Sequence, residues 1–340
     1  MSRSVLPSRP RLRHALPVVA AITASLVLSA CSSTTPAASS DASNAATRTV
    51  THELGTVTIP TAPKNIVALD EYAAMDLLSV GVKPTHVYRS LQSATSGAAL
   101  EQTGTDLIDD PTFLTSPNIE ALASLHPDVL VMSNTGPLVP VYQQLSEVAP
   151  VVALPFATDW RTIVGETGKA FGAEQAAEHV TKRLGAFEDE VASQVRQHSG
   201  TTSVLLGFQD MIMTPASDAP LSRLLADVGV TRPASEQNIP SAEGADATVP
   251  VSPEKLADHA ADTTVVLSGG YYDPAVVQGA PTFAGTRVAL ADGDAWFGSH
   301  PFGIFWVLSD LQTLAGGSTA LGTAADAAAR WASFSALVKH

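Results

Sequence analysis

The chain has 340 residues and a formal net charge of −14, which argues against nucleic acid as a partner because phosphate neutralisation needs a basic surface. It contains one cysteine, Cys31, so an internal disulfide is excluded. The length is natural for two domains rather than one.

Residues 1–30 have the composition of a bacterial export signal. A basic start with four arginines precedes an apolar run, residues 15–28, that is too short to span a bilayer comfortably. The run ends in Leu28-Ser-Ala-Cys31, which resembles a lipobox, so we expect a lipoprotein signal peptide over 1–30 and lipidation of Cys31. A plain signal peptide with a chance cysteine is the alternative. Removal of these residues takes the net charge from −14 to −18, because they contain no acidic residue.

Residues 31–48 are rich in Ser, Thr, Ala and Pro without an apolar period, and they predict a flexible tether. An N-terminal lobe is expected over 49–171. It begins with predicted strands at 55–60 and 63–69, and Asp70 then caps a helix over 72–80 that Gly81 ends. Residues 82–88 lead into another strand. This order of strand, helix and strand predicts a parallel sheet.

A long amphipathic helix is predicted near the middle of the chain, from Gly172 to Gln197. Its apolar positions recur every three or four residues, and most of the charged residues, Glu188 among them, are expected on the opposite face. At about 1.5 Å per residue it would be roughly 37 Å long, enough to cross a small domain. We therefore expect an interlobe backbone helix over 172–198 and a C-terminal lobe over 199–340.

The two sides of this helix carry a repeated unit. Glu120 and Glu254 each follow a Ser-Pro pair, precede a leucine by two residues and an aspartate by eight, and are followed by an apolar strand. Serine followed by proline favours a helix start, so each unit predicts a short capped helix with a glutamate in its first turn, followed by a buried strand. The predicted fold class is α/β, with two similar lobes of parallel-rich sheet, one long helix joining them and a ligand cleft between them.

The last elements follow the same alternation. Asp292-Gly-Asp294 predicts a turn that positions Trp296. An apolar helix is expected over 302–314 and a closing amphipathic helix over 324–338.

Three segments carry a family resemblance. They read IPTAPKNIVALDEYAAMDLLSVGVKP, SPNIEALASLHPDVLVMS and YQQLSEVAPVV. In order and spacing they resemble the helical-backbone (class III) solute-binding proteins of ABC transporters, which carry ferric siderophores, haem and vitamin B12. The resemblance covers roughly residues 54–314 and implies two lobes with little hinge bending. It also implies a monomer that delivers a ferric siderophore to permease subunits with a separate ATPase.

The resemblance assigns a docking role to the repeated glutamates. In this family one glutamate on each lobe docks onto permease arginines, and Glu120 and Glu254 match those positions. A two-lobed protein on a two-fold permease needs one anchor per lobe, which agrees with their place in repeated units. A simpler role is that each glutamate complements its helix dipole, worth about 0.3–1 kcal/mol.

Candidate ligand-binding residues lie where loops leave the carboxyl ends of the predicted strands. Aromatic side chains pack on flat chelate rings, and arginine pairs with carboxylate or catecholate oxygens. Arg89, Trp296 and His300 are the first choices, and each of the candidates could instead serve ordinary packing. The candidates are Arg89, Tyr72, Asn134, Trp160, Arg161, Met213, Tyr271, Tyr272, Trp296, Phe297 and His300.

Other ligands and activities stay open at this point. The place where the family's hydroxamate binders often carry an arginine holds Phe113-Leu-Thr115 here, which puts that style of hydroxamate recognition in doubt. A haem or corrinoid ligand is an alternative, and Tyr271 or Tyr272 could serve as a haem ligand. A bare zinc or manganese carrier is less favoured because the histidines are scattered. A serine hydrolase using Ser299 and His300 lacks a G-x-S-x-G elbow.

We therefore expect a protein without catalytic residues, resident metal or cofactor. We expect the protein to be exported and lipid-anchored to the outer face of the cytoplasmic membrane.

Overall fold

The computed structural model describes residues 46–198, 200–241, 247–283 and 286–339. The predicted signal peptide, Cys31 and nearly all of the predicted tether lie outside these residues. Thr47 and Arg48, which were expected in the tether, already belong to the first strand, β1. Thr47 pairs with Pro60 and Arg48 with Ile59 of the antiparallel partner β2, so the folded part starts slightly earlier than the composition suggests.

The N-terminal lobe is built on a five-stranded parallel sheet in the order β5-β4-β3-β6-β7. A two-stranded antiparallel hairpin, β1-β2, precedes it. Its strands are β1 (Thr47–His52), β2 (Gly55–Pro60), β3 (Ile66–Ala68), β4 (His86–Tyr88), β5 (Asp106–Ile108), β6 (Val129–Ser133) and β7 (Val151–Leu154). Its helices are α1 (Glu71–Ser79), α2 (Ala94–Leu100), η1 (Glu101–Thr103), α3 (Ile119–Ser124), η2 (Val139–Val141), α4 (Tyr142–Val148) and α5 (Trp160–Phe171).

The C-terminal lobe contains a second five-stranded sheet, in the order β10-β9-β8-β11-β12. Strands β8, β11 and β12 are parallel, whereas β9 runs antiparallel to both of its neighbours. The strands are β8 (Thr202–Phe208), β9 (Met211–Pro215), β10 (Thr248–Pro250), β11 (Thr263–Ser268) and β12 (Arg287–Asp292). The helices are α7 (Pro220–Asp227), η3 (Ala234–Glu236), η4 (Pro253–His259), α8 (Pro274–Gln278), η5 (Pro281–Phe283) and α9 (Gly293–Phe297).

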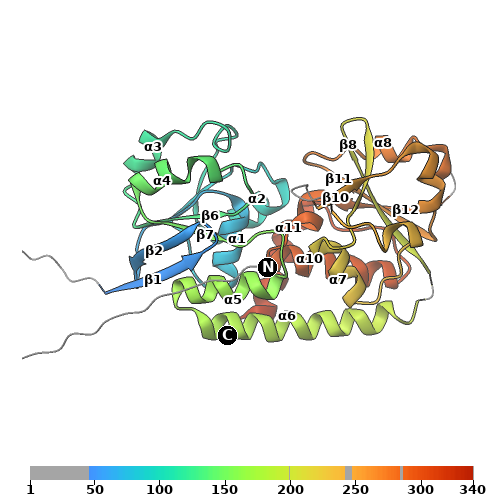
Figure 1. The fold of residues 1–340 in the computed structure, drawn as a ribbon. Coiled ribbons are helices and arrows are strands. Elements are labelled where there is room, and N and C mark those ends of the chain that lie inside the picture. The colour runs from blue at the N-terminus through green and yellow to red at the C-terminus, as the bar shows by residue number, and fades with distance from the viewer. Residues whose placement is uncertain (1–45, 199, 242–246, 284–285, 340) are drawn as a thin grey trace, which may run out of the picture. The chain divides into compact units, whose positions relative to one another are not determined.

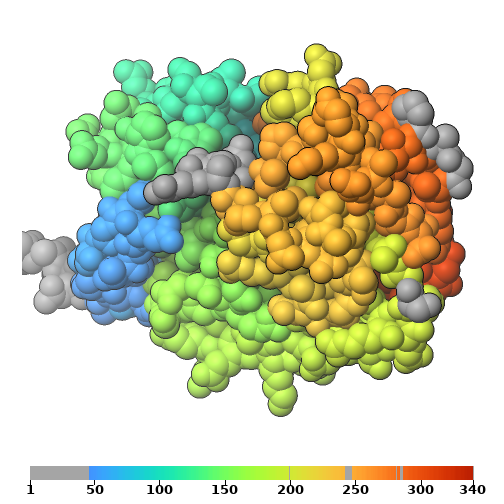
Figure 2. All heavy atoms as spheres, turned by 45° about the vertical axis from the view of Figure 1, so that its right-hand side comes forward, coloured from blue at the N-terminus to red at the C-terminus, as the bar shows by residue number. Residues whose placement is uncertain are grey.

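The long helix α6 (Glu174–Val195) connects the two lobes and runs beneath both of them (Figure 1). It appears again in yellow-green along the lower edge of the space-filling view, under the blue-to-green and the yellow-to-orange lobes (Figure 2). The helix begins later than predicted because Gly172, with a φ of 69°, is the left-handed cap of α5. Two helices therefore meet where the sequence suggested the start of one.

The prediction that Glu188 lies on the charged face of the long helix is wrong. Glu188 stands four residues after Leu184 and three before Val191, on the buried stripe, and only 7% of its surface is exposed. Its carboxylate accepts hydrogen bonds from Trp160 Nε1 at 3.3 Å and Arg161 Nη2 at 2.9 Å, at the start of α5. A buried carboxylate with two donors of this kind holds α5 against α6.

The chain returns to both lobes at its C-terminus. Helix α10 (Pro301–Ala315) contacts α6 and α1, and α11 (Ala327–Val338), which follows the short η6 (Ala324–Asp326), contacts α2 and α6. Phe302 and Trp306 of α10 pack edge to face, with ring centroids 5.9 Å apart. Both rings are fully buried in a cluster that includes residues of both lobes. This core fixes the lobes against a common helical layer (Figure 1).

The two predicted helix starts differ from the structure in detail. Asn118, not Ser116, caps α3, because its side-chain oxygen accepts the N–H of Ala121 at 3.0 Å. Ser252 precedes η4, which is a 3-10 helix rather than an α-helix and has no side-chain cap. Asp292 is likewise more than a turn residue, because it caps the short helix α9 through the N–H of Ala295.

Candidate functional site

A cavity of about 620 Å³ lies where the carboxyl ends of the strands of the two lobes meet. Three of its residues come from the N-terminal lobe: Thr135 follows β6, and Phe156 and Ala157 follow β7. The remaining lining residues come from the C-terminal lobe and from α10. Ligand pockets of α/β proteins favour this edge of the sheet, and the volume falls within their usual range.

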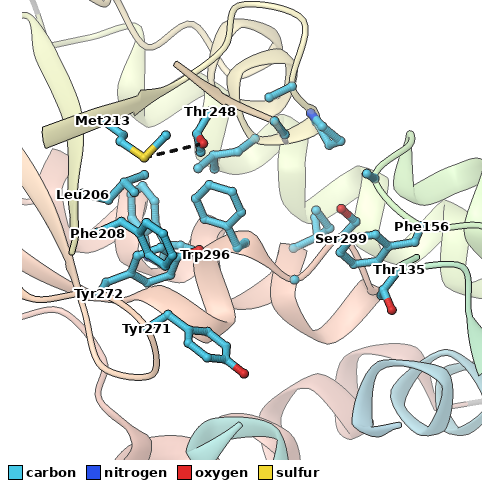
Figure 3. A pocket seen from close by; sticks show the side chains of 18 of the residues that line it. Thr135, Phe156, Leu206, Phe208, Met213, Thr248, Tyr271, Tyr272, Trp296 and Ser299 are labelled. Carbon is cyan, nitrogen blue, oxygen red and sulfur yellow. Dashed lines mark hydrogen bonds between the residues drawn. The ribbon is translucent and has the colours of Figure 1, made fainter. Parts of the chain in front are cut away.

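Three aromatic side chains from neighbouring strands form one wall. Phe208 ends β8, Tyr272 follows β11, and Trp296 lies in α9, directly after β12. Because β8, β11 and β12 are adjacent parallel strands, their ends bring these rings together, as Figure 3 shows. Tyr272 also packs on Phe297, with centroids 5.5 Å apart. The result is a wall of rings suited to flat or apolar ligand surfaces.

Trp296 is held in place from behind. Its Nε1 donates to Oδ2 of Asp310 at 2.8 Å, and only 2% of its surface is exposed. The indole N–H is therefore satisfied inside the protein, and the ring can contribute an apolar face to the cavity. Gly293 allows Tyr272 to approach α9, since a Cβ at this glycine would lie 2.2 Å from the tyrosine ring.

The hairpin β8-β9 supplies a further part of the lining beside this wall. Its turn passes through Gln209 in a left-handed conformation, with a φ of 53°. Met213 then lines the cavity with its sulfur 4.0 Å from Thr248 Oγ1 (Figure 3). Met211 is 44% exposed and Tyr271 is 67% exposed, both in the lining of the cavity. Flexible thioethers and exposed apolar rings at a cavity mouth are typical of a ligand site.

Comparison with known proteins identifies the family of the chain. The family profile described as "Periplasmic binding protein" matches residues 66–294. The chain belongs to this family.

Named relatives of this periplasmic binding protein include two lipoproteins of Bacillus subtilis (strain 168). The probable siderophore-binding lipoprotein YfiY is 29% identical over 61% of this chain, and the match spans 64% of the relative's length. The putative ABC transporter substrate-binding lipoprotein YhfQ is 29% identical over 76% of this chain and 80% of its own length. Among solved structures, SirA of Staphylococcus aureus complexed with staphyloferrin B has a TM-score of 0.62 at 22% identity, covering 80% of this chain and 100% of SirA. This structural likeness concerns the fold.

Tyr72 and His300, two of the predicted site residues, meet at the junction of the lobes. Tyr72 stacks on Phe156 with centroids 5.7 Å apart and lies 5.1 Å from the His300 ring. Its hydroxyl donates to the backbone oxygen of Asp294 at 3.4 Å. Both residues thus border the cavity through Phe156 and α9 rather than lining it directly.

His300 is neutral in the folded protein. Burial lowers its pKa to about 3, and its Nδ1 accepts the N–H of Gly303 at 3.0 Å as the cap of α10. Its Nε2 is buried without a hydrogen-bond partner among the residues that the structure describes. Since Nδ1 is engaged by the helix cap, this histidine is not arranged as a general base for the neighbouring Ser299, which weakens the hydrolase alternative.

A second polar contact joins the lobes beside the cavity. Thr95 of α2 donates to Asp292 Oδ2 at 2.6 Å. Burial raises the pKa of Asp294 to about 6, with Asp292 adding repulsion and hydrogen bonds from Ala94 and Ser93 opposing the rise. Acidic groups of α9 therefore rest against the N-terminus of α2.

Four predicted site residues are engaged elsewhere. Trp160 and Arg161 contact Glu188 on α6, as described above, and Asn134 donates to Glu53. Arg89 packs on α2, since a Cβ at Gly97 would lie 2.9 Å from its Nη2, and its Nε is buried without a partner in the described part of the chain. None of the four belongs to the residues that line the cavity.

Sequence reasoning missed two aromatic lining residues, Phe208 and Phe156. Phe208 directly precedes a turn at Gln209, and Phe156 follows Pro155 at the end of an apolar run. Both therefore sit at strand ends, which is a signal that the sequence contained. Leu206, Thr248 and Ile304 also line the cavity without having been predicted.

The predicted docking glutamates are both accessible. Glu120 lies in the first turn of α3 and Glu254 in the first turn of η4, and both are exposed. Within the described ranges, no group of three or more His, Cys, Asp or Glu side chains is arranged to hold a metal ion. A search of the same residues for a helix both long and apolar enough to cross a membrane finds none.

Proposed function

We propose that this chain is the substrate-binding lipoprotein of an ABC importer and that it binds a ferric siderophore in the interlobe cavity. The observation that carries the proposal is the aromatic cavity of about 620 Å³ at the strand ends of both lobes. Such a site suits a bulky chelate with flat metal-binding groups and apolar linkers. The printed names of the relatives, a siderophore-binding lipoprotein and an ABC substrate-binding lipoprotein, support the same ligand class and partner.

Binding in this proposal is non-covalent, and the protein catalyses no reaction on its ligand. Hydroxyl, thioether and aromatic groups dominate the lining, and His300 is engaged as a helix cap. These groups supply contact area and hydrogen bonds rather than a nucleophile with its base. The iron chelate is the transported ligand rather than a resident cofactor.

The proposed location is the outer face of the cytoplasmic membrane. Cys31 would carry the lipid, and the Ser- and Pro-rich segment that follows would act as the tether. Radiolabelled fatty acid incorporated by the wild type and lost in Cys31→Ser supports this arrangement. Equal labelling of both proteins argues for a different anchor.

A binding assay tests the ligand. Tryptophan fluorescence is titrated with ferric hydroxamate, catecholate and citrate chelates, with haem and with a corrinoid. We expect saturable one-to-one quenching by a ferric siderophore and at least about 10-fold weaker binding in Phe208→Ala, since a buried ring contributes about 1.5–3 kcal/mol. Leu290→Ala, which shortens an exposed apolar side chain outside the cavity, serves as the control. Tight binding of haem or a corrinoid alone contradicts the siderophore assignment.

A transport assay tests the partner. Glu120→Arg combined with Glu254→Arg should abolish uptake while leaving the dissociation constant of the chelate unchanged, because both residues lie outside the cavity lining. Glu178→Arg, on the exposed surface of α6, is the matched control for charge reversal. Normal uptake by the double variant would contradict the docking role of the two glutamates. A large loss of chelate affinity in the double variant would contradict it as well.

A further inference from the structure

We infer that the interlobe cavity selects ferric chelates without net negative charge over anionic ones. This inference rests on the proposed function and adds the charge class of the ligand. Its basis is that none of the described residues lining the cavity has a charged side chain. The polar groups of the lining are the hydroxyls of Thr135, Thr248, Ser299, Tyr271 and Tyr272, together with backbone groups.

The arginines that sequence reasoning favoured do not supply a positive charge to the cavity. Arg161 is paired with Glu188 at 2.9 Å and with Asp159 at 3.6 Å. The guanidinium of Arg89 is packed against α2 at Gly97. A ligand anion in the cavity would therefore lose its hydration without gaining a partner cation from either arginine.

Acidic side chains also lie at the lobe junction. Asp292 and Asp294 open α9, the helix that contributes Trp296 and Phe297 to the lining. Glu71 at the start of α1 accepts the N–H groups of Leu91 and Ser93, which precede α2. To the extent that they are ionised, these acidic side chains disfavour an anionic ligand further and tolerate a cationic one.

Ferric chelates of different chemical classes differ in net charge, so an uncharged cavity should distinguish between them. Three hydroxamates, each with a single negative charge, neutralise ferric iron, whereas three catecholates leave a complex with three negative charges. The neutral complex presents carbon and carbonyl surface that aromatic rings and thioethers contact well. A negative charge buried without a partner cation is strongly penalised, so we expect at least about 100-fold weaker binding of the tricatecholate.

The test compares two chelates on the full-length protein. Equilibrium fluorescence titrations use ferrichrome as the neutral ferric trihydroxamate and ferric enterobactin as the anionic tricatecholate. A ratio of dissociation constants near or above 100 in favour of ferrichrome supports the inference. Equal or tighter binding of ferric enterobactin overturns the charge selectivity while leaving the siderophore function intact. Failure of every ferric chelate in the wider panel overturns both.

A charge-insertion variant separates charge from shape. Tyr271→Arg adds a cation at the exposed rim, where it should tighten binding of ferric enterobactin by up to about 5-fold, as expected for a solvent-exposed ion pair. The gain should vanish at high salt. Leu290→Arg replaces another exposed apolar side chain, outside the cavity, and is the matched control. It should change the affinity neither for ferrichrome nor for ferric enterobactin. Equal gains in both variants would attribute the effect to net charge and overturn the role of the cavity.

Discussion

Gly293 is the position where a single added methyl group tests the geometry of the aromatic wall. A Cβ at this residue would lie 2.2 Å from Cδ2 and 2.8 Å from Cε2 of Tyr272, whereas ordinary contacts begin near 3.4 Å. The Tyr272 ring must therefore retreat by about 1.2 Å, toward the cavity that it lines. Overpacking of this kind costs typically about 1–3 kcal/mol of folding free energy.

The same displacement should weaken ligand binding. A misplaced aromatic contact is worth about 0.5–1.5 kcal/mol, so Gly293→Ala should raise the dissociation constant of the chelate by about 2- to 12-fold. Urea unfolding measures the stability, and fluorescence titration measures the affinity. Gly185→Ala on α6 is the control, because a Cβ there meets no atom within 4 Å and should stabilise the helix by about 0.5–1 kcal/mol. Unchanged stability and affinity in Gly293→Ala would refute the placement of Tyr272 against α9.

Three further predictions follow from buried polar contacts. Burial raises the pKa of Glu71 from 4.5 to about 7, so the folded state holds its proton more tightly. The free energy of unfolding should therefore fall by up to about 3 kcal/mol as pH rises from 4.5 to 7. Urea unfolding of Glu71→Gln should lack this fall. If the variant and the wild type show the same dependence of stability on pH, the raised pKa of Glu71 is contradicted. Arg161→Ala leaves buried Glu188 with one hydrogen-bond donor fewer, so thermal unfolding should show a loss of about 1–3 kcal/mol of stability and chelate affinity should not change. A loss of chelate affinity without a loss of stability would instead indicate that Arg161 contacts the ligand. Thr95→Val removes the hydrogen bond to Asp292 between the lobes and should cost about 1–2 kcal/mol in urea unfolding; a fully stable variant would show that this bond does not hold the lobes.

The architecture was largely predictable because periodicity and repetition report it directly. The repeated units around Glu120 and Glu254 predicted two similar lobes, and the parallel strands of both sheets confirm this. The ends of the helices were less predictable, because a helical pattern and a helix-ending residue can occur at the same position. Gly172 stands at the start of the predicted long helix, but its conformational freedom makes it the left-handed cap that ends α5.

Glu188 illustrates why a charged residue was misplaced. Its spacing from Leu184 and Val191 put it on the apolar stripe, yet its charge suggested solvent. The deciding fact was the partner, because Trp160 and Arg161 reach it from a separate helix. Sequence reasoning cannot supply that partner without the packing of α5 on α6.

The candidate site was predicted in part for a similar reason. The rule that ligands bind at the carboxyl ends of strands located Met213, Tyr271, Tyr272, Trp296 and Phe297, which all line the cavity. The arginines were chosen for the chemistry expected of the ligand rather than for their position. Within the fold, Arg161 pairs with Glu188 and Asp159, and Arg89 packs against α2 at Gly97.

A crystal structure of the protein with a bound ferric chelate, recorded at the iron absorption edge, tests the central claim most directly. The account predicts one anomalous iron peak inside the cavity bounded by Phe208, Tyr272 and Phe156, with the chelate touching residues of both lobes. An iron peak at a surface site, or a chelate held by Arg89 and Arg161 outside this cavity, would contradict it.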